Sequence, residues 1–256
     1  MSTLEHHDTT VDDTGTRRRW LGFGGLAVAS FLGCIDLTIV TTALPEITRG
    51  LDTDVATSQL TLGVFLMALA MFMVTAGRLA DRYGRKKVLL IGLSLFVVAS
   101  VGAALAGTIA ALVIARFFQG AATATLYTST STLVESLFGE GERGRAIGLL
   151  YAINGVGLAA GPVLGALLVP TWGWPAIFWV NLPLGLLALV AIVIAVDESR
   201  AETSTGSDWA GQVALAVTVV AGIGVPVLGD IAGWLSLSVL ASAVVFLGGL
   251  ALTVVV

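Results

Sequence analysis

The segment GRLADRYGRKKVL, from Gly77 to Leu89, joins two apolar stretches and places five basic residues around one acid, Asp81. The flanking stretches, 57–78 and 87–106, each hold about 20 mostly apolar residues, enough for a helix to cross a bilayer. A short basic connection between two such helices is typical of the cytoplasmic side of a membrane protein. Gly84 predicts a tight turn within it. The segment therefore predicts a helical hairpin in a membrane.

The rest of the chain has the same character. Of its 256 residues 56% are apolar and only 12% are charged, whereas soluble domains carry about 25% charged residues. We expect an all-α membrane protein with a disordered cytoplasmic tail over 1–16 and a polar cytoplasmic linker over 197–208. The sequence predicts eight membrane spans, at 20–46, 57–78, 87–106, 109–135, 145–169, 175–196, 209–228 and 233–256.

The composition excludes several classes of protein. Cys34 is the single cysteine and lies in an apolar stretch, which excludes a disulfide framework and a cysteine-based metal site. Both histidines, His6 and His7, lie in the polar tail. The sequence shows no basic patch for nucleic acid, no phosphate-binding loop and no nucleophile motif. We therefore expect no enzyme, no metal and no cofactor.

The basic residues predict the orientation of the spans. Eleven lie on one side of the predicted helices and only Arg49 lies on the other. Because basic loops stay in the cytoplasm, the N-terminus is expected to be cytoplasmic. The eleven are Arg17, Arg18, Arg19, Arg78, Arg82, Arg85, Lys86, Lys87, Arg143, Arg145 and Arg200.

The segment from Gly77 to Leu89 resembles the loop signature of the major facilitator superfamily, G-x-L-A-D-R-x-G-R-[RK], at every defining position. In that family the acid caps a helix and pairs with a base across two helical bundles, so that the loop acts as a conformational latch. The resemblance implies this role for Asp81. The implied latch residues are Gly77, Asp81, Arg82, Gly84, Arg85 and Lys86.

Other motifs follow in the order expected of that family. The segment CIDLTIVTTALPEI, 34–47, resembles the first-helix signature of the drug:proton antiporters. ARFFQGAATA, 115–124, resembles the family's R-x-x-Q-G helix, and FWVNLPLG, 178–185, resembles its sixth helix. The resemblance implies a major-facilitator-like six-helix N-terminal bundle over 17–196, built as a 3+3 inverted repeat.

The two predicted spans in 209–256 resemble the extra central helix pair of the 14-helix antiporters, since they follow a short linker and open with Asp208-Trp209-Ala210-Gly211. In a 14-helix antiporter, a six-helix bundle and this pair would be followed by six more helices. The sequence is therefore expected to be the N-terminal portion of a transporter, with its C-terminal six-helix bundle absent, and not to transport alone.

Asp36 and Arg116 are the two ionisable residues deep inside the apolar spans. At 1.5 Å per residue they lie at similar depths, about 13 and 10 Å from the outer ends of their helices, so a buried ion pair is expected. Ionisable groups inside a membrane usually mark a substrate or proton path. We expect a proton-coupling role for the pair; the alternative is that it only holds two helices together.

Polar and small residues follow Arg116 on one helical face, at spacings of three, four, seven and eleven residues. Such a face is expected to line a substrate cavity and, without a second bundle, to open toward lipid. Hydrogen bonding between helices is the alternative. The predicted cavity residues are Gln119, Gly120, Thr123, Tyr127 and, on the next span, Asn154.

The fifth span carries glycines four residues apart, a spacing that permits close helix packing. Pro162 is expected to bend this helix. The resemblance adds that the segment is the antiporter hinge, made by Gly148, Gly157, Gly161, Pro162 and Gly165.

Together these features predict proton-coupled export of small amphipathic drugs or antibiotics across a bacterial plasma membrane by alternating access. The proton gradient would drive transport, and the expected partners are the substrate, protons, the lipid bilayer and the missing bundle. The alternative is a membrane module that does not transport, such as a half-transporter subunit, a scaffold or a truncated remnant. A membrane enzyme is a more distant alternative.

Overall fold

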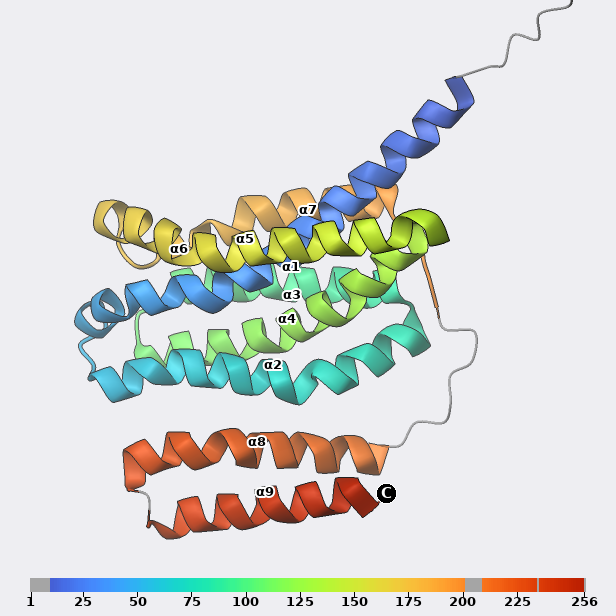
Figure 1. Cartoon of the computed structure of the whole chain (residues 1–256). Coiled ribbons are helices and arrows are strands. Elements are labelled where there is room, and N and C mark those ends of the chain that lie inside the picture. Colours follow the sequence, from blue (N-terminus) through green and yellow to red (C-terminus); the bar gives the residue numbers. More distant parts are fainter. Residues whose placement is uncertain (1–9, 201–208, 234, 256) are drawn as a thin grey trace, which may run out of the picture.

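A computed structural model describes residues 10–200, 209–233 and 235–255 of the chain. These residues are helical almost throughout (Figure 1). The helices are α1 (Thr10–Gly50), α2 (Val55–Tyr83), α3 (Arg85–Ala104), α4 (Ile109–Leu137), α5 (Glu140–Trp172), α6 (Ala176–Trp179), α7 (Asn181–Ala195), α8 (Trp209–Ala232) and α9 (Leu237–Val255).

Six helical segments of the described chain are long and apolar enough to cross a membrane, in agreement with the first six predicted spans. The last of them, Ala176–Ala195, comprises α6 and α7. They are separate because Pro183 has no N–H to donate to the carbonyl four residues earlier. Helices α8 and α9 lie in the region of the seventh and eighth predicted spans.

The start of α1 differs from the prediction. The helix begins at Thr10, so 10–16 are helical where a disordered tail was expected. A helix already nucleated by the long apolar span can extend into polar residues at little cost, because propagation is easier than nucleation. The remainder of the predicted tail, 1–9, and most of the predicted linker, 201–208, lie outside the described residues.

Helix α1 lies at the centre of the bundle and packs against α2, α4, α5 and α7. Two buried apolar clusters run along it, one around Leu32 and one around Ile39. Figure 1 shows α8 and α9 as an antiparallel pair beside α2, which is the bundle helix that α8 contacts most. The helices that carry Asp36, Arg116 and the predicted α5 glycines therefore meet around α1.

The start of α2 is fixed by Asp54, whose carboxylate accepts hydrogen bonds from the Thr57 backbone N–H at 2.9 Å and from the Thr57 hydroxyl at 2.7 Å. These bonds hold the pKa of Asp54 below its ordinary value of 3.8. A carboxyl whose pKa is lowered by folding stabilises the folded state above its unfolded pKa, and this contribution is lost as the pH falls through its folded value.

We predict that Asp54→Ala accelerates hydrogen exchange of the Thr57 amide several-fold at neutral pH, because an N-cap that satisfies an orphan amide has been removed. Well below pH 3.8 the difference from the unaltered chain should disappear. Exchange measured by mass spectrometry on the purified chain checks this. The nearby exposed Asp52 has φ +47°, which asparagine tolerates, so Asp52→Asn is the control and should leave the Thr57 amide unchanged at both pH values.

Candidate functional site

The centre of the bundle contains the ion pair expected from the sequence. Arg116 Nη1 of α4 donates to Asp36 Oδ2 of α1, and both side chains are fully buried. Two charges out of water are tolerated only when each has polar partners that replace its hydration. The residues around the pair supply them.

Arg116 is held by α2 as well as by its ion-pair partner. Its Nε donates to the Thr61 carbonyl oxygen at 3.2 Å, and Nη1 also donates to Gln119 Oε1 at 3.0 Å. The guanidinium lies 4.1 Å from the centre of the Phe65 ring, within the range of a cation–π contact. Among the described residues, Nη2 has no hydrogen-bond partner.

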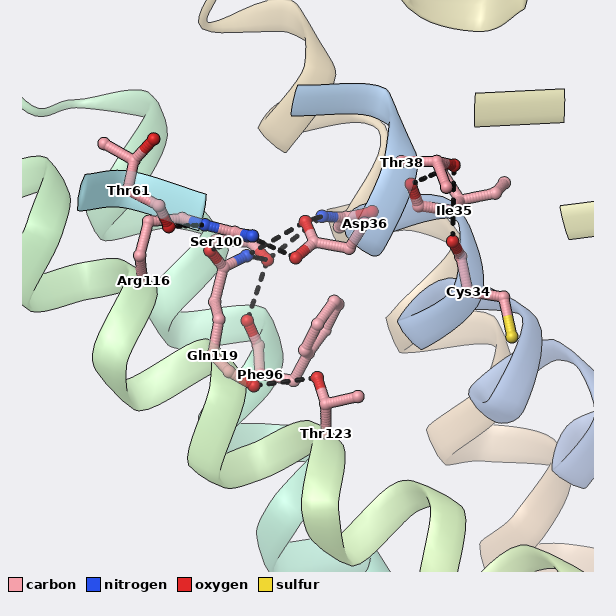
Figure 2. Close-up of polar contacts among 11 residues, drawn as sticks. Cys34, Ile35, Asp36, Thr38, Thr61, Phe96, Ser100, Arg116, Gln119 and Thr123 are labelled. Carbon is pink, nitrogen blue, oxygen red and sulfur yellow. Dashed lines mark hydrogen bonds and ion pairs between the residues drawn. The ribbon is translucent and has the colours of Figure 1, made fainter. Parts of the chain in front are cut away.

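The second oxygen of Asp36 accepts from two uncharged amides; Figure 2 shows one of them, Gln119, beside Asp36 and Arg116. Asn181 Nδ2 of α7 lies 3.2 Å from Asp36 Oδ1, and Gln119 Nε2 lies 3.4 Å from it. Both amides also donate to Ser100 Oγ of α3, at 3.2 and 2.7 Å. One polar network thus joins α1, α3, α4 and α7 inside the apolar bundle.

Sequence reasoning missed three members of this network, Ser100, Asn181 and the Thr61 carbonyl. Asn181 and Ser100 are fully buried polar side chains in apolar spans, a feature that marks functional or interhelical positions in membranes. Asn181 lies inside the FWVNLPLG segment, so that signal was present. Their convergence depends on tertiary packing, which residue spacing within one span does not reveal.

The polar face of α4 is closed within this chain, so its expected opening toward lipid is wrong. Gln119, Gly120 and Thr123 are all buried. The Thr123 hydroxyl donates to the Gln119 carbonyl at 2.8 Å, and the Gly120 backbone packs against Phe65 of α2. Asp36 compensates the charge of Arg116 inside the bundle. In the described conformation this face therefore does not need a second bundle to neutralise that charge.

The other two predicted cavity residues lie apart from the ion pair. Tyr127 donates its hydroxyl to Cys34 Sγ at 3.4 Å, and the ring packs beside Gly33 of α1. Asn154 is half-buried on α5, and its Oδ1 has no partner among the described residues. A cavity of about 740 Å³ lies instead between α2, α8 and α9, and apolar side chains including Leu60, Met67 and Val220 line it. The substrate-cavity assignment therefore stays a prediction.

The glycines of α5 divide into two groups. Gly157, Gly161 and Gly165 are buried against α1, where a Cβ at Gly161 would overlap the Thr38 hydroxyl. That hydroxyl donates to the Leu158 carbonyl of α5 at 3.1 Å. The other two predicted hinge residues, Gly148 and Pro162, are exposed and lie off this contact. The close α1–α5 approach is present, and a hinge role remains a prediction.

The predicted latch loop forms the tight turn that Gly84 suggested, with φ +111° at that residue. Asp81 Oδ1 accepts from Arg85 Nε at 3.0 Å and from Nη2 at 2.9 Å, so the acid is paired within its own loop. The Arg82 guanidinium lies 5.5 Å from the Tyr83 ring centre. Gly77 is loosely surrounded on α2. The cross-bundle pairing that the resemblance implies for Asp81 remains a prediction.

Residues after α7 cap the start of α3, and Lys86 at the start of α3 caps the end of α7. Sequence reasoning missed this pair of contacts. The Glu198 carboxylate accepts from the backbone N–H groups of Lys86 and Lys87, at 2.9 and 3.1 Å, and so caps α3 where Gly84 offers no side chain. In return Lys86 Nζ donates to the carbonyls of Val193 and Val196 near the end of α7, at 3.0 and 2.6 Å. Each helix end is satisfied by a charge of the sign that favours it.

Glu198→Ala is predicted to accelerate hydrogen exchange of the Lys86 and Lys87 amides several-fold, because both lose their acceptor. Glu198→Gln keeps one amide oxygen and should give an intermediate rate. Exchange at 85–88 measured by mass spectrometry distinguishes the three chains. Equal rates in all three would show that the cap does not protect the start of α3.

The basic segments predicted to share one side of the membrane lie at one end of the bundle. Arg18 pairs with Asp197 at 2.6 Å and Arg19 with Glu142 at 2.8 Å. The Arg85 N–H donates to the Ser199 carbonyl at 2.9 Å. These contacts bring together the start of α1, the loop before α3, the start of α5 and the segment after α7, as the alternation of spans requires.

Curated relatives were found for most of the chain. Over 207 residues it is 39% identical to the multidrug resistance protein Stp of Mycobacterium tuberculosis, a match that covers 80% of this chain and 38% of that protein. Over 221 residues it is 37% identical to the tetracenomycin C resistance and export protein of Streptomyces glaucescens, covering 84% of this chain and 41% of that protein. The chain thus spans about two fifths of the length of these relatives.

Solved structures share the fold at low sequence identity. An auto-inhibited POT family peptide transporter superposes with a TM-score of 0.65 at 15% identity, covering 91% of this chain and 51% of that one. The sequence model of the Major Facilitator Superfamily matches residues 26–256. This chain, a multi-pass helical membrane protein, belongs to the Major Facilitator Superfamily.

Proposed function

We propose that this chain takes part in proton-coupled export of small amphipathic compounds across a bacterial plasma membrane. The observation that carries the proposal is the fully buried pair of Asp36 and Arg116 at the centre of the helical bundle. Two of its relatives are named for multidrug resistance and for tetracenomycin C resistance and export. Those names support export of drug-like compounds as the activity.

The proton would act on the ion pair. When Asp36 is ionised, Arg116 and the two amides stabilise it, and the helices that carry them stay together. Protonation removes the negative charge and leaves Arg116 without a counter-ion, so the arrangement that suits one state does not suit the other. A conformational change that separates the two side chains would bind a proton on one side of the membrane and release it on the other.

Export would also require a second six-helix bundle, because facilitator halves rock about a site held between them. Helices α2 and α5 are the least buried of the six long spans, which leaves faces for such a partner. The gathering of basic segments at one end supports a cytoplasmic N-terminus. Asp81 would then meet its cross-bundle base, and Asn154 and Tyr127 would line the cavity between the bundles.

The test is proton-dependent efflux of ethidium from energised vesicles of an efflux-deficient bacterium. Two forms are compared: the chain expressed alone, and the chain fused to the C-terminal half of the tetracenomycin C relative. We expect efflux from the joined protein, its loss in Asp36→Asn, and normal efflux in Asp52→Asn, which makes the same chemical change at an exposed loop position. Unchanged efflux in Asp36→Asn would refute proton coupling through this pair.

A further inference from the structure

Asn181 is the uncharged residue that links Asp36 to both α3 and α7. It is fully buried, its Nδ2 donates to Asp36 Oδ1 and to Ser100 Oγ, and its Oδ1 has no partner among the described residues. A buried amide normally uses its oxygen as well as its nitrogen. An unused acceptor beside a carboxyl is therefore the feature that needs explanation.

The charge on Asp36 explains the orientation of the amide. The three described groups that contact this carboxylate are all N–H donors. They are Arg116 Nη1, Gln119 Nε2 and Asn181 Nδ2. An ionised carboxylate only accepts, so turning Asn181 Oδ1 toward it would set two oxygens against each other. The amide nitrogen must face Asp36 while it is charged, and the amide oxygen is left over.

Protonation reverses this requirement. A proton taken from solvent forms an O–H bond on Asp36 Oδ1, and that O–H is a donor that faces donors only. Asn181 can supply the missing acceptor by rotating its amide half a turn, which exchanges Nδ2 and Oδ1 without moving α7. Gln119 is less free to do so, because its Oε1 already accepts from Arg116.

We propose that Asn181 is the proton-responsive partner of Asp36, donating to the ionised carboxylate through Nδ2 and accepting from the protonated carboxyl through Oδ1 after its amide rotates. This role rests on the proposed proton coupling. It makes Asn181 a positioning residue that stabilises both protonation states. Before the rotation the Ser100 hydroxyl donates to the Phe96 carbonyl at 2.8 Å and accepts from Asn181 Nδ2. After it, the hydroxyl turns its proton toward Asn181 Oδ1, and Ser100 Oγ accepts from Gln119 in both states.

The groups that face Asp36 leave few other sources of a pH response. Arg116 of α4 is the charged one, while α3 and α7 contribute the uncharged Ser100 and Asn181. Cys34 and Tyr127 are hydrogen-bonded to each other nearby, between α1 and α4. A spectral change of the Asn181 amide that accompanies protonation of Asp36 can thus be assigned to that carboxyl.

The chain offers a clean probe, because Asn154 and Asn181 are its only asparagines. The chain is synthesised with ¹³C-carbonyl side-chain asparagine, placed in lipid nanodiscs and titrated under infrared difference spectroscopy. Protonation of Asp36 appears as a carboxylic acid band that is lost in the double variant Asp36→Leu/Arg116→Leu. Asn154→Ala leaves the Asn181 carbonyl as the one labelled band, and the unlabelled chain is the blank.

The rotation predicts that the Asn181 carbonyl stretch moves to lower wavenumber as the acid band appears, since the oxygen gains a hydrogen bond. It predicts no pH response of the Asn181 band in the double variant. A stretch that stays fixed or moves to higher wavenumber while Asp36 titrates would show that Asn181 remains a donor, and would overturn this inference alone. Absence of any acid band due to Asp36 would overturn proton coupling itself.

Discussion

Replacing Arg116 by leucine is expected to lower the free energy of unfolding of the bundle by about 3–5 kcal/mol, because Asp36 is left buried without its counter-ion. The loss should be this large because the pair is fully buried and Arg116 also contacts the Thr61 carbonyl and the Phe65 ring. Denaturant unfolding of the chain in mild detergent, followed by circular dichroism, measures it.

The double variant Asp36→Leu/Arg116→Leu is the informative control. Removing both charges as a unit is expected to recover most of the stability, since apolar residues can replace a buried ion pair at little cost or with a gain. The coupling between the two sites then follows from a double-mutant cycle. If Arg116→Leu unfolds at the same denaturant concentration as the unaltered chain, the pair does not stabilise this bundle.

The first six spans and the ion pair could be predicted from the sequence because each rests on a strong local signal. A bilayer sets the length of a span, and a charge inside one needs a partner at the same depth. Asp36 and Arg116 are the charged residues deep inside their spans, whereas Glu46 and Glu135 lie at the span ends, so the pairing followed from depth and charge. The break between α6 and α7 depends on the same kind of local fact, the missing N–H of Pro183.

The remainder of the site could not be predicted, because it depends on which helix faces meet. Asn181 and Ser100 each carry the signal of a polar residue in an apolar span, but only the packing of α7 and α3 brings them to Asp36. Glu198 lies in a polar segment that looked like a linker, and only the fold places it over the start of α3. The polar face of α4 was recognised, but spacing along one helix does not tell a cavity from a neighbouring helix.

Gly120 shows how one glycine of that face permits the ion-pair site to form. Arg116 and Gly120 are one turn apart on α4, and they contact Thr61 and Phe65, one turn apart on α2. A Cβ at Gly120 would overlap the Phe65 carbonyl oxygen and lie 3.0 Å from its carbonyl carbon. Since these are backbone atoms, α2 would have to move away from α4 and take the Arg116 partner with it.

Gly120→Ala is therefore expected to destabilise the chain by about 1–3 kcal/mol, the usual cost of forcing an extra methyl group into a packed contact. Gly148→Ala is the matched control on α5, because nothing lies within 4 Å of a Cβ there. It should leave stability unchanged or raise it by up to about 1 kcal/mol, the helix propensity gained over glycine. Denaturant unfolding of both variants, in parallel with the unaltered chain, separates the two effects. Equal stability of Gly120→Ala and Gly148→Ala would mean that α2 can shift freely, and that the Thr61 carbonyl is not required to hold Arg116 against Asp36.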